Sequence, residues 1–189
     1  WPVTRTTADY ASVLKITRDY FEKKAPSVSL KLFASNAKKF YDLEEIQIEP
    51  GTKKLPLSGE SFRINGRNAF VILPEKVEDK TPWVWYAPTL PGLPAKSEIW
   101  MFQQFLAKGI AIAGIDVGES YGSQDGRKGF SELYEYLTRQ RNFAKKPCLL
   151  ARSRGGLMLY NWAVENPGKV GGVAGIYPVC NLESYPGIA

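Results

Sequence analysis

The fold of this chain is decided by one stretch, Leu149-Leu150-Ala151-Arg152-Ser153-Arg154-Gly155-Gly156-Leu157-Met158. A short apolar run leads into a serine between small residues, and an amphipathic run follows. This order is typical of a nucleophile elbow, a sharp strand-to-helix turn that raises a serine hydroxyl above a sheet. The positions two before and two after the serine nearly touch across such a turn, and here they are Ala151 and Gly155. The stretch therefore predicts that Ser153 is a nucleophile.

The sequence lacks the residue that usually activates such a serine, because the 189-residue chain contains no histidine. Histidine normally accepts the proton of the serine nucleophile. No lysine lies near Ser153 in the sequence to replace it. Glu183, the only carboxylate after the last predicted strand, is a weak candidate for the acid of a catalytic triad. A helix N-cap is the simpler explanation of Ser153. The buried strand before it, the small flanking residues and the helix after it favour the nucleophile.

Composition and charge exclude several classes of protein. The chain is 44% hydrophobic and 23% charged, and it is long enough for one domain with a core. Its net charge of +6 includes scattered lysine doublets, with no long basic run of a nucleic-acid module. No apolar run is long enough to span a membrane. Because the chain begins with Trp1 rather than Met, we expect an exported protein whose signal segment has been removed.

Hydrophobic periodicity divides the chain into an N-terminal extension, residues 1–59, and a main domain, residues 60–189. Three elements are predicted in the extension, two helices and then a half-buried strand, over residues 7–24, 36–43 and 45–49. The main domain begins with strands over 60–64 and 68–73 on either side of Asn65-Gly66. This dipeptide is the strongest short hairpin signal, so the domain begins with an antiparallel meander.

From residue 83 onward the chain alternates between apolar strands and amphipathic helices. Strands are predicted over 83–87, 110–117, 148–151 and 170–178, and helices over 98–108, 127–143 and 154–166. Gly109 is expected to cap the first of these helices. Continuous apolar strands joined through helices by short loops imply right-handed crossovers and a mostly parallel α/β sheet. The last strand would be a bare apolar edge, which natural proteins avoid. We therefore expect the fold to lack its last strands in this sequence.

Two loops at the carboxyl ends of the strands are expected to line the site, because ligands bind at that edge of a parallel sheet. Loop 88–94 is rich in Gly and Pro, and its Leu93 N–H is the expected partner of the Arg154 N–H in holding an oxyanion. A plain structural turn is the alternative for this loop. Glu119 and Tyr121, after the next strand, are expected to bind substrate together with the Arg154 guanidinium.

Other residues near these loops are expected to be structural. Asp116 should fix its loop by hydrogen bonds, and Arg152 should form an ion pair. Cys148 and Cys180 lie too far apart on neighbouring strands for a disulfide, and we expect two buried free thiols. Residues 118–122 lack the spacing of a phosphate-binding or dinucleotide-binding loop. No metal or cofactor is therefore expected.

Four blocks of the sequence resemble a known bacterial family. The blocks are 83–92, 114–123, 152–157 and 177–182. They are similar to α/β-hydrolase-fold serine hydrolases of planctomycete-type bacteria, described as prolyl-oligopeptidase-like or esterase-like, and the resemblance covers about residues 60–189. It implies eight strands, with an Asp after the seventh and a His after the eighth, both beyond Ala189. It also implies that Ser153 is the nucleophile and that Arg154 and Leu93 are oxyanion donors.

The residues and the resemblance together predict a serine hydrolase acting on a carboxylic ester. We expect a small-molecule or saccharide ester as the substrate, because the Ser-Arg pair of residues 153–154 also occurs in glucuronoyl esterases. We expect no nucleic-acid or membrane partner, and we expect the 189-residue chain alone to be inactive. The alternative, favoured by the missing histidine, is a truncated or degenerate hydrolase fold that only binds a ligand. A prolyl-oligopeptidase-type peptidase is disfavoured because no propeller repeats precede residue 60.

Overall fold

The computed structural model describes residues 10–32, 46–77 and 79–187, and the contacts divide the chain into two units at residues 45 and 46. The first unit contains helices α1 (Tyr10–Lys24) and α2 (Pro26–Leu30). Helix α1 confirms the helix predicted over 7–24 in its described part. Helix α1 ends at Lys24, directly before Ala25-Pro26, as expected. Pro26 then occupies the first turn of α2, where its missing N–H costs no hydrogen bond. The helix predicted over 36–43 lies outside the described residues.

The second unit begins with an antiparallel meander of strands β1 (Ile48–Pro50), β2 (Glu60–Ile64) and β3 (Arg67–Ile72). Asn65 and Gly66 have φ angles of 47° and 81°, the conformation of a two-residue hairpin turn, which confirms the predicted hairpin. Strand β1 is exposed, where a half-buried strand was expected, because β1 is the outer strand of the sheet.

The meander joins a set of four parallel strands. These are β4 (Trp83–Tyr86), β5 (Ala111–Ile115), β6 (Cys148–Arg152) and β7 (Gly172–Ile176). The strand order is β1-β2-β3-β5-β4-β6-β7, so β4 lies between β5 and β6 with both neighbours parallel to it. Every residue of β4 and β5 is buried, as expected for strands covered on both faces. The predicted α/β sheet with an antiparallel entry is confirmed.

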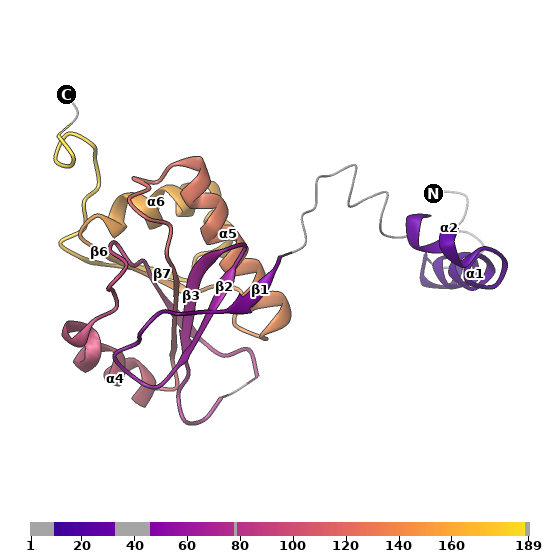
Figure 1. Cartoon of the computed structure of the whole chain (residues 1–189), viewed down its shortest axis with the longest axis horizontal. Coiled ribbons are helices and arrows are strands. Elements are labelled where there is room, and N and C mark those ends of the chain that lie inside the picture. The colour runs from indigo at the N-terminus through magenta and orange to yellow at the C-terminus, as the bar shows by residue number, and fades with distance from the viewer. Residues whose placement is uncertain (1–9, 33–45, 78, 188–189) are drawn as a thin grey trace. The chain divides into compact units, whose positions relative to one another are not determined.

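Helices cover both faces of this sheet, with α5 and α6 on one side and α4 on the other (Figure 1). The helical segments are η3 (Lys96–Glu98), α4 (Ile99–Ala107), α5 (Gln124–Gln140), α6 (Gly155–Glu165) and η4 (Pro167–Lys169). Gly109, with φ at 74°, follows α4 as the sequence predicted. Helix α5 begins three residues earlier than predicted, because the Ser123 side chain accepts a hydrogen bond from the Gly126 N–H as its N-cap.

The core has two layers, one on each face of the sheet. Alternate residues of β4 point to opposite layers, as strand geometry requires. Trp85 packs under α5 and α6, with its ring centroid 4.7 Å from that of Trp162. Tyr86 points to the other layer, where its ring lies 5.5 Å from that of Phe102 on α4. Both layers place large aromatic side chains directly below the carboxyl end of β4, which makes this end of the sheet a rigid support.

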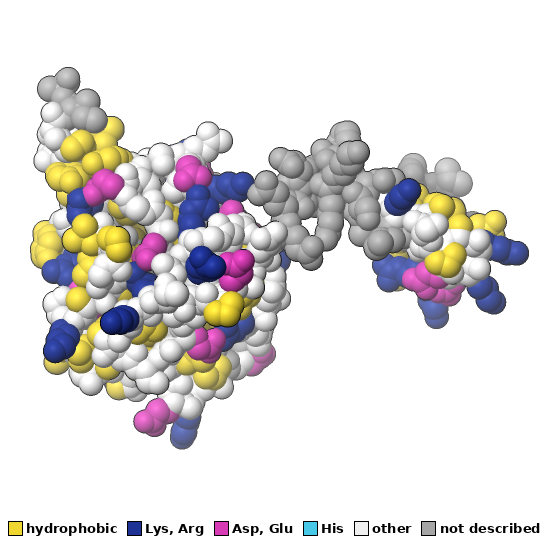
Figure 2. Space-filling model, viewed as in Figure 1, with side chains coloured by type: hydrophobic (Ala, Val, Ile, Leu, Met, Phe, Trp, Pro, Cys, Tyr) yellow, Lys and Arg dark blue, Asp and Glu magenta, His cyan; other side chains and the backbone are white. Residues whose placement is uncertain are grey.

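Strand β7 is the edge of the sheet, and among the described residues it pairs only with β6. Val173, the second residue of β7, is 55% exposed, which confirms the bare apolar edge that the sequence predicted. Figure 2 shows hydrophobic side chains gathered over the segment that follows β7.

Both cysteines are free, but the expectation that both are buried was wrong. Cys148 is half-buried. Cys180 is exposed, because the segment after β7 that contains it is largely uncovered. None of the described helices is long and apolar enough to cross a membrane.

Candidate active site

Ser153 occupies a sharp turn between β6 and α6, so the predicted strand–turn–helix arrangement is present. Its φ angle is 50°, a left-handed conformation that costs a residue with a side chain about 1–2 kcal/mol and that is concentrated at functional sites. The turn is held from the side of β7. The Ser153 N–H donates to the Ile176 carbonyl (3.0 Å), and the Ser153 carbonyl accepts from the Val179 N–H (2.9 Å). The Ser153 hydroxyl has no hydrogen-bond partner among the described residues, which leaves it available to a substrate.

The two glycines after Ser153 have different functions in this turn. A Cβ atom on Gly155 would lie 3.4 Å from the Ala87 Cβ and 3.7 Å from the Thr89 Cγ2, both ordinary contacts. The atoms nearest to such a Cβ therefore belong to Ala87 and Thr89, directly after β4. A Cβ atom on Gly156 would lie 2.3 Å from the Val179 carbonyl oxygen, which no side chain can occupy. Gly156 thus allows the segment after β7 to pack against the first turn of α6.

The backbone donors of the proposed oxyanion hole agree only in part with the prediction. The Arg154 N–H has no partner among the described residues, and it lies at the start of α6, where negative charge is favoured. The Leu93 N–H, predicted as the second donor, instead donates to the Leu90 carbonyl at 3.0 Å. Leu93 closes a turn within its own loop, so its N–H is engaged. The Leu90 N–H, in the same loop, has no partner among the described residues.

The residues predicted to bind substrate lie together beside the elbow. The Arg154 guanidinium pairs with the Glu119 carboxylate and donates to the Tyr185 hydroxyl at 2.9 Å. The hydrogen bond with Tyr185, more than the charge of Glu119, raises the pKa of Arg154 above its usual value. The Tyr121 and Tyr185 rings lie 6.1 Å apart. Tyr185 completes this group and was not predicted, because it lies 31 residues from Arg154 in a segment without regular structure. The weak acid candidate Glu183 is exposed in the same segment.

The loops after β4 and β5 are joined by a buried lysine that the sequence did not indicate. Lys53 is 2% exposed, and its Nζ lies 2.7 and 2.8 Å from the two carboxylate oxygens of Asp116 and 3.0 Å from the Pro91 carbonyl. Burial raises the pKa of Asp116, and the Lys53 ammonium opposes that rise. The expected fixing function of Asp116 is confirmed. A small pocket of about 240 Å³ lies between these loops, lined by residues 88–91 together with Asp116, Gly118 and Glu119.

Arg152, just before the nucleophile candidate, forms the ion pair that the sequence predicted. Its partner is Glu98 of η3, whose side chain is fully buried. The Arg152 Nε also donates to the Tyr177 hydroxyl at 2.8 Å. The Tyr86 hydroxyl is buried beside this pair, and burial together with the Glu98 charge raises its pKa well above the usual value. The chain before Ser153 is thereby fixed to elements on both sides of β6.

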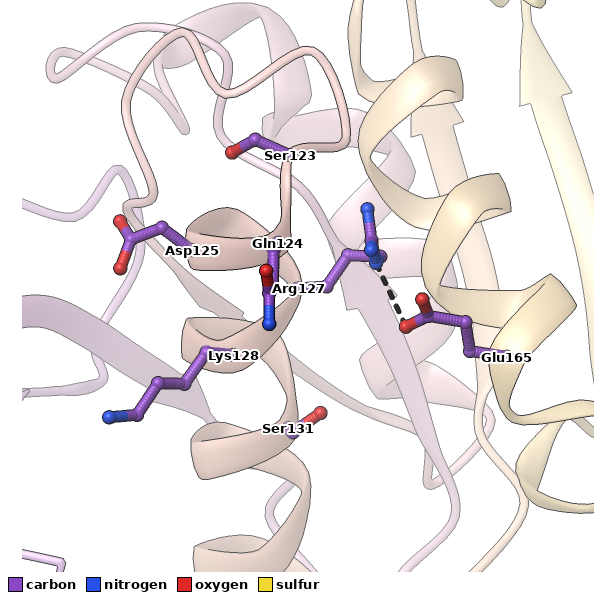
Figure 3. A pocket seen from close by; sticks show the side chains of 7 residues that line it. All are labelled: Ser123, Gln124, Asp125, Arg127, Lys128, Ser131 and Glu165. Atoms are coloured by element: carbon purple, nitrogen blue, oxygen red, sulfur yellow. Dashed lines mark ion pairs between the residues drawn. The ribbon is translucent and has the colours of Figure 1, made fainter.

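A larger surface hollow of about 740 Å³ lies away from the elbow, beside the N-terminal part of α5 (Figure 3). The Arg127 side chain on α5 extends across it to Glu165 on α6, with 2.8 Å between Nε and the carboxylate. Ser131 accepts the indole N–H of Trp162 at 3.0 Å. These side chains are engaged in holding α5 against α6, so the hollow is structural. Among the described residues, no group of His, Cys, Asp or Glu side chains is placed to hold a metal ion.

Comparison with solved structures finds chains of similar overall fold. The chain is similar to Est1E from Butyrivibrio proteoclasticus, with 16% identity and a TM-score of 0.51 over 62% of this chain and 49% of that one. It is similar to a prolyl endopeptidase, with 15% identity and a TM-score of 0.51 over 75% and 22%. A candidate carboxylesterase from Lactobacillus plantarum shows 11% identity and a TM-score of 0.54 over 77% and 65%.

These similarities define the class of fold. The chain has an α/β-hydrolase fold, as the resemblance of its sequence blocks implied. It spans less than two thirds of the length of each of the three chains. No family model matches the sequence, and no curated protein matches it.

Proposed function

We propose that the protein is a serine hydrolase that cleaves a carboxylic ester through an acyl-enzyme on Ser153. The observation that carries the proposal is the left-handed Ser153 at the start of α6. Within the part of the chain that the structure describes, neither its hydroxyl nor the adjacent Arg154 N–H has a hydrogen-bond partner. The general hydrolase activity of this fold class, seen in the names of the similar structures, is consistent with the proposal.

In the proposed reaction the Ser153 Oγ attacks the ester carbonyl and gives up its proton to a base. The negative oxygen of the tetrahedral intermediate accepts hydrogen bonds from the Arg154 N–H and from a second amide of the loop after β4. We assign the second donor to Leu90, because the Leu93 N–H is engaged in a turn. Collapse of the intermediate breaks the bond to the alcohol, which leaves with a proton, and water then hydrolyses the acyl-enzyme.

The base and the acid of the triad are proposed to come from residues beyond Ala189. The printed sequence has no histidine, and Lys53, which contacts both site loops, is occupied by Asp116 and Pro91. Chain order in this fold class places the nucleophile before the acid and the histidine. The uncovered edge of β7 is where further strands can add to the sheet.

The proposed substrate is a small-molecule ester, with a carbohydrate ester as the favoured kind. Arg154 and Glu119 offer hydrogen-bond donors and acceptors for hydroxyl groups, and Tyr121 and Tyr185 add two aromatic rings beside them. The pocket between the loops after β4 and β5 has room for a small group of the substrate.

The test is hydrolysis of p-nitrophenyl acetate by the protein at its full natural length and by its Ser153→Ala variant. The proposal predicts turnover that disappears in the variant while the circular dichroism spectrum is unchanged. Equal turnover by both proteins would overturn it. The 189-residue chain alone is predicted to be inactive.

A ligand-binding domain without catalysis is the second candidate. The one observation that favours it is the absence of histidine from the chain. In that case the full-length protein would hydrolyse no ester, and Ser153→Ala would leave ligand binding unchanged, which separates the two candidates.

A further inference from the structure

Glu98 is a fully buried carboxylate that lies beside the candidate site without reaching it. It ends η3, the single helical turn after the loop that follows β4, and its side chain is 0% exposed. A buried charge is costly unless it is paired and hydrogen-bonded. Three donors hold the Glu98 carboxylate: the Ala95 N–H at 2.8 Å, the Ser97 hydroxyl at 2.9 Å and the Arg152 guanidinium.

The two oxygens of this carboxylate contact different segments of the chain. Oε2 binds Ala95 and Ser97, which fixes the end of the loop that contains Leu90. Oε1 binds Arg152, which is 54 residues further along and adjacent to Ser153. A carboxylate that only capped η3 would need Oε2 alone. Oε1 connects the loop to the elbow through Arg152.

The connection extends to the far side of the elbow through Arg152. Its Nε donates to the Tyr177 hydroxyl at 2.8 Å, and its guanidinium lies 5.8 Å from the centre of the Tyr177 ring. Tyr177 follows β7, the strand whose Ile176 carbonyl accepts the Ser153 N–H. The guanidinium has a planar set of donors that can hold two partners in fixed directions at once. Glu98, Arg152 and Tyr177 thus form one chain of contacts from the loop after β4 to the end of β7.

We propose that Glu98 is a positioning residue that sets the distance between the Leu90 loop and the Arg154 N–H. This inference rests on the proposed serine hydrolase function. The two oxyanion donors belong to separate segments, and the Glu98–Arg152 pair is a direct polar connection between those segments. Donors stabilise an oxyanion only when both lie at hydrogen-bond distance from the same point. Loss of the connection should therefore slow the chemical step and leave substrate binding nearly unchanged.

The experiment compares Glu98→Gln with a matched control, Glu132→Gln, in the full-length protein. Glu132 is also a poorly exposed carboxylate in an ion pair, with Arg67 at 3.4 Å, but it belongs to α5 and its partner to β3. We expect Glu98→Gln to lower kcat about 10- to 100-fold, the range expected for a displaced or weakened oxyanion donor. We expect its KM to stay within about threefold of wild type, as for an interaction realised in the transition state. Glu132→Gln should keep the wild-type kcat.

The outcomes separate this inference from the proposed function. If wild type shows turnover that Ser153→Ala abolishes, while folded Glu98→Gln keeps its kcat within about twofold, the positioning function of Glu98 is wrong and the hydrolase remains. If kcat falls equally in Glu98→Gln and Glu132→Gln, the effect is general destabilisation and the inference is also wrong. Should Glu98→Gln fail to fold, Glu98→Asp decides. It keeps the charge but retracts the carboxylate, and an unchanged kcat would overturn the inference, whereas a kcat loss at constant KM would support it.

Discussion

Replacing Lys53 with methionine tests whether a buried ion pair holds the two site loops together. The Lys53 side chain is 2% exposed and that of Asp116 is 21% exposed. The variant leaves the Asp116 carboxylate without its cation and the Pro91 carbonyl without its donor. Breaking a buried pair by removing one partner costs about 3–5 kcal/mol. Because water reaches part of Asp116, we expect the lower end, about 3 kcal/mol.

The loss should depend on pH in a defined direction. Burial already raises the pKa of Asp116 in the folded wild type, and removal of the Lys53 ammonium would raise that pKa further. A carboxyl whose folded pKa is raised contributes stability that is complete below its unfolded pKa and is lost as pH rises through the folded pKa. The penalty of Lys53→Met should therefore be larger at neutral pH than in acid, because protonation of Asp116 removes the unpaired charge.

The assay is urea unfolding followed by tryptophan fluorescence, since Trp83, Trp85 and Trp162 are buried. In thermal unfolding, the same loss of about 3 kcal/mol corresponds to a fall in Tm of about 6–12 °C for a unit of this size. Lys54→Met is the matched control, because Lys54 is exposed and its loss should change stability by less than about 0.5 kcal/mol. Equal effects of the two variants, or a Lys53→Met penalty independent of pH, would refute the reasoning.

Three further predictions concern the elbow and the cysteines. Gly156→Ala should lower the free energy of unfolding by about 1–3 kcal/mol, because its methyl group would lie 2.3 Å from a carbonyl oxygen of the segment after β7. The control Gly155→Ala, whose methyl group would lie 3.4 Å from its nearest neighbour, should lower it by less than about 0.5 kcal/mol. Equal losses of the two variants in urea unfolding would contradict this prediction. Ser153→Gly should be more stable than Ser153→Ala by about 1 kcal/mol, because glycine adopts a φ of 50° without strain; a higher Tm for the alanine variant would count against a left-handed elbow. Iodoacetamide should modify exposed Cys180 well before Cys148, whose pKa is raised by burial, and peptide mapping that finds Cys148 modified first would disprove the burial of that thiol.

Local patterns in the sequence predicted most of the fold, because they depend on neighbouring residues. Asn65-Gly66 specified its hairpin through two positive φ angles, and Gly109 specified the end of α4 through its own positive φ angle. The strand–turn–helix around Ser153 was predictable because a buried strand, small residues and an amphipathic helix follow one another directly. Helix α5 began earlier than expected because its N-cap, Ser123, precedes residues without clear apolar periodicity.

The polar connections of the candidate site could not be predicted, because they join residues far apart in the sequence. Lys53 and Asp116 are separated by 63 residues, and Glu98 and Arg152 by 54. Nothing in the local sequence of Lys53 or Glu98 distinguishes them from exposed charges. Lys53 belongs to the segment 46–59, which the sequence placed in the extension, and in the structure it lies buried in the unit that contains the sheet. Leu93 was predicted as an oxyanion donor because it lies in a Gly- and Pro-rich loop, and the turn that engages its N–H has no sequence signature of its own.

The central claim, that Ser153 is a nucleophile, is tested most directly by a fluorophosphonate probe on the full-length protein. The probe forms a covalent bond only with an activated serine hydroxyl, and peptide mass mapping identifies the modified residue. The account predicts one adduct, on Ser153, that is lost in Ser153→Ala. A correctly folded full-length protein that takes up no probe, or that takes it up on another residue, would contradict the account.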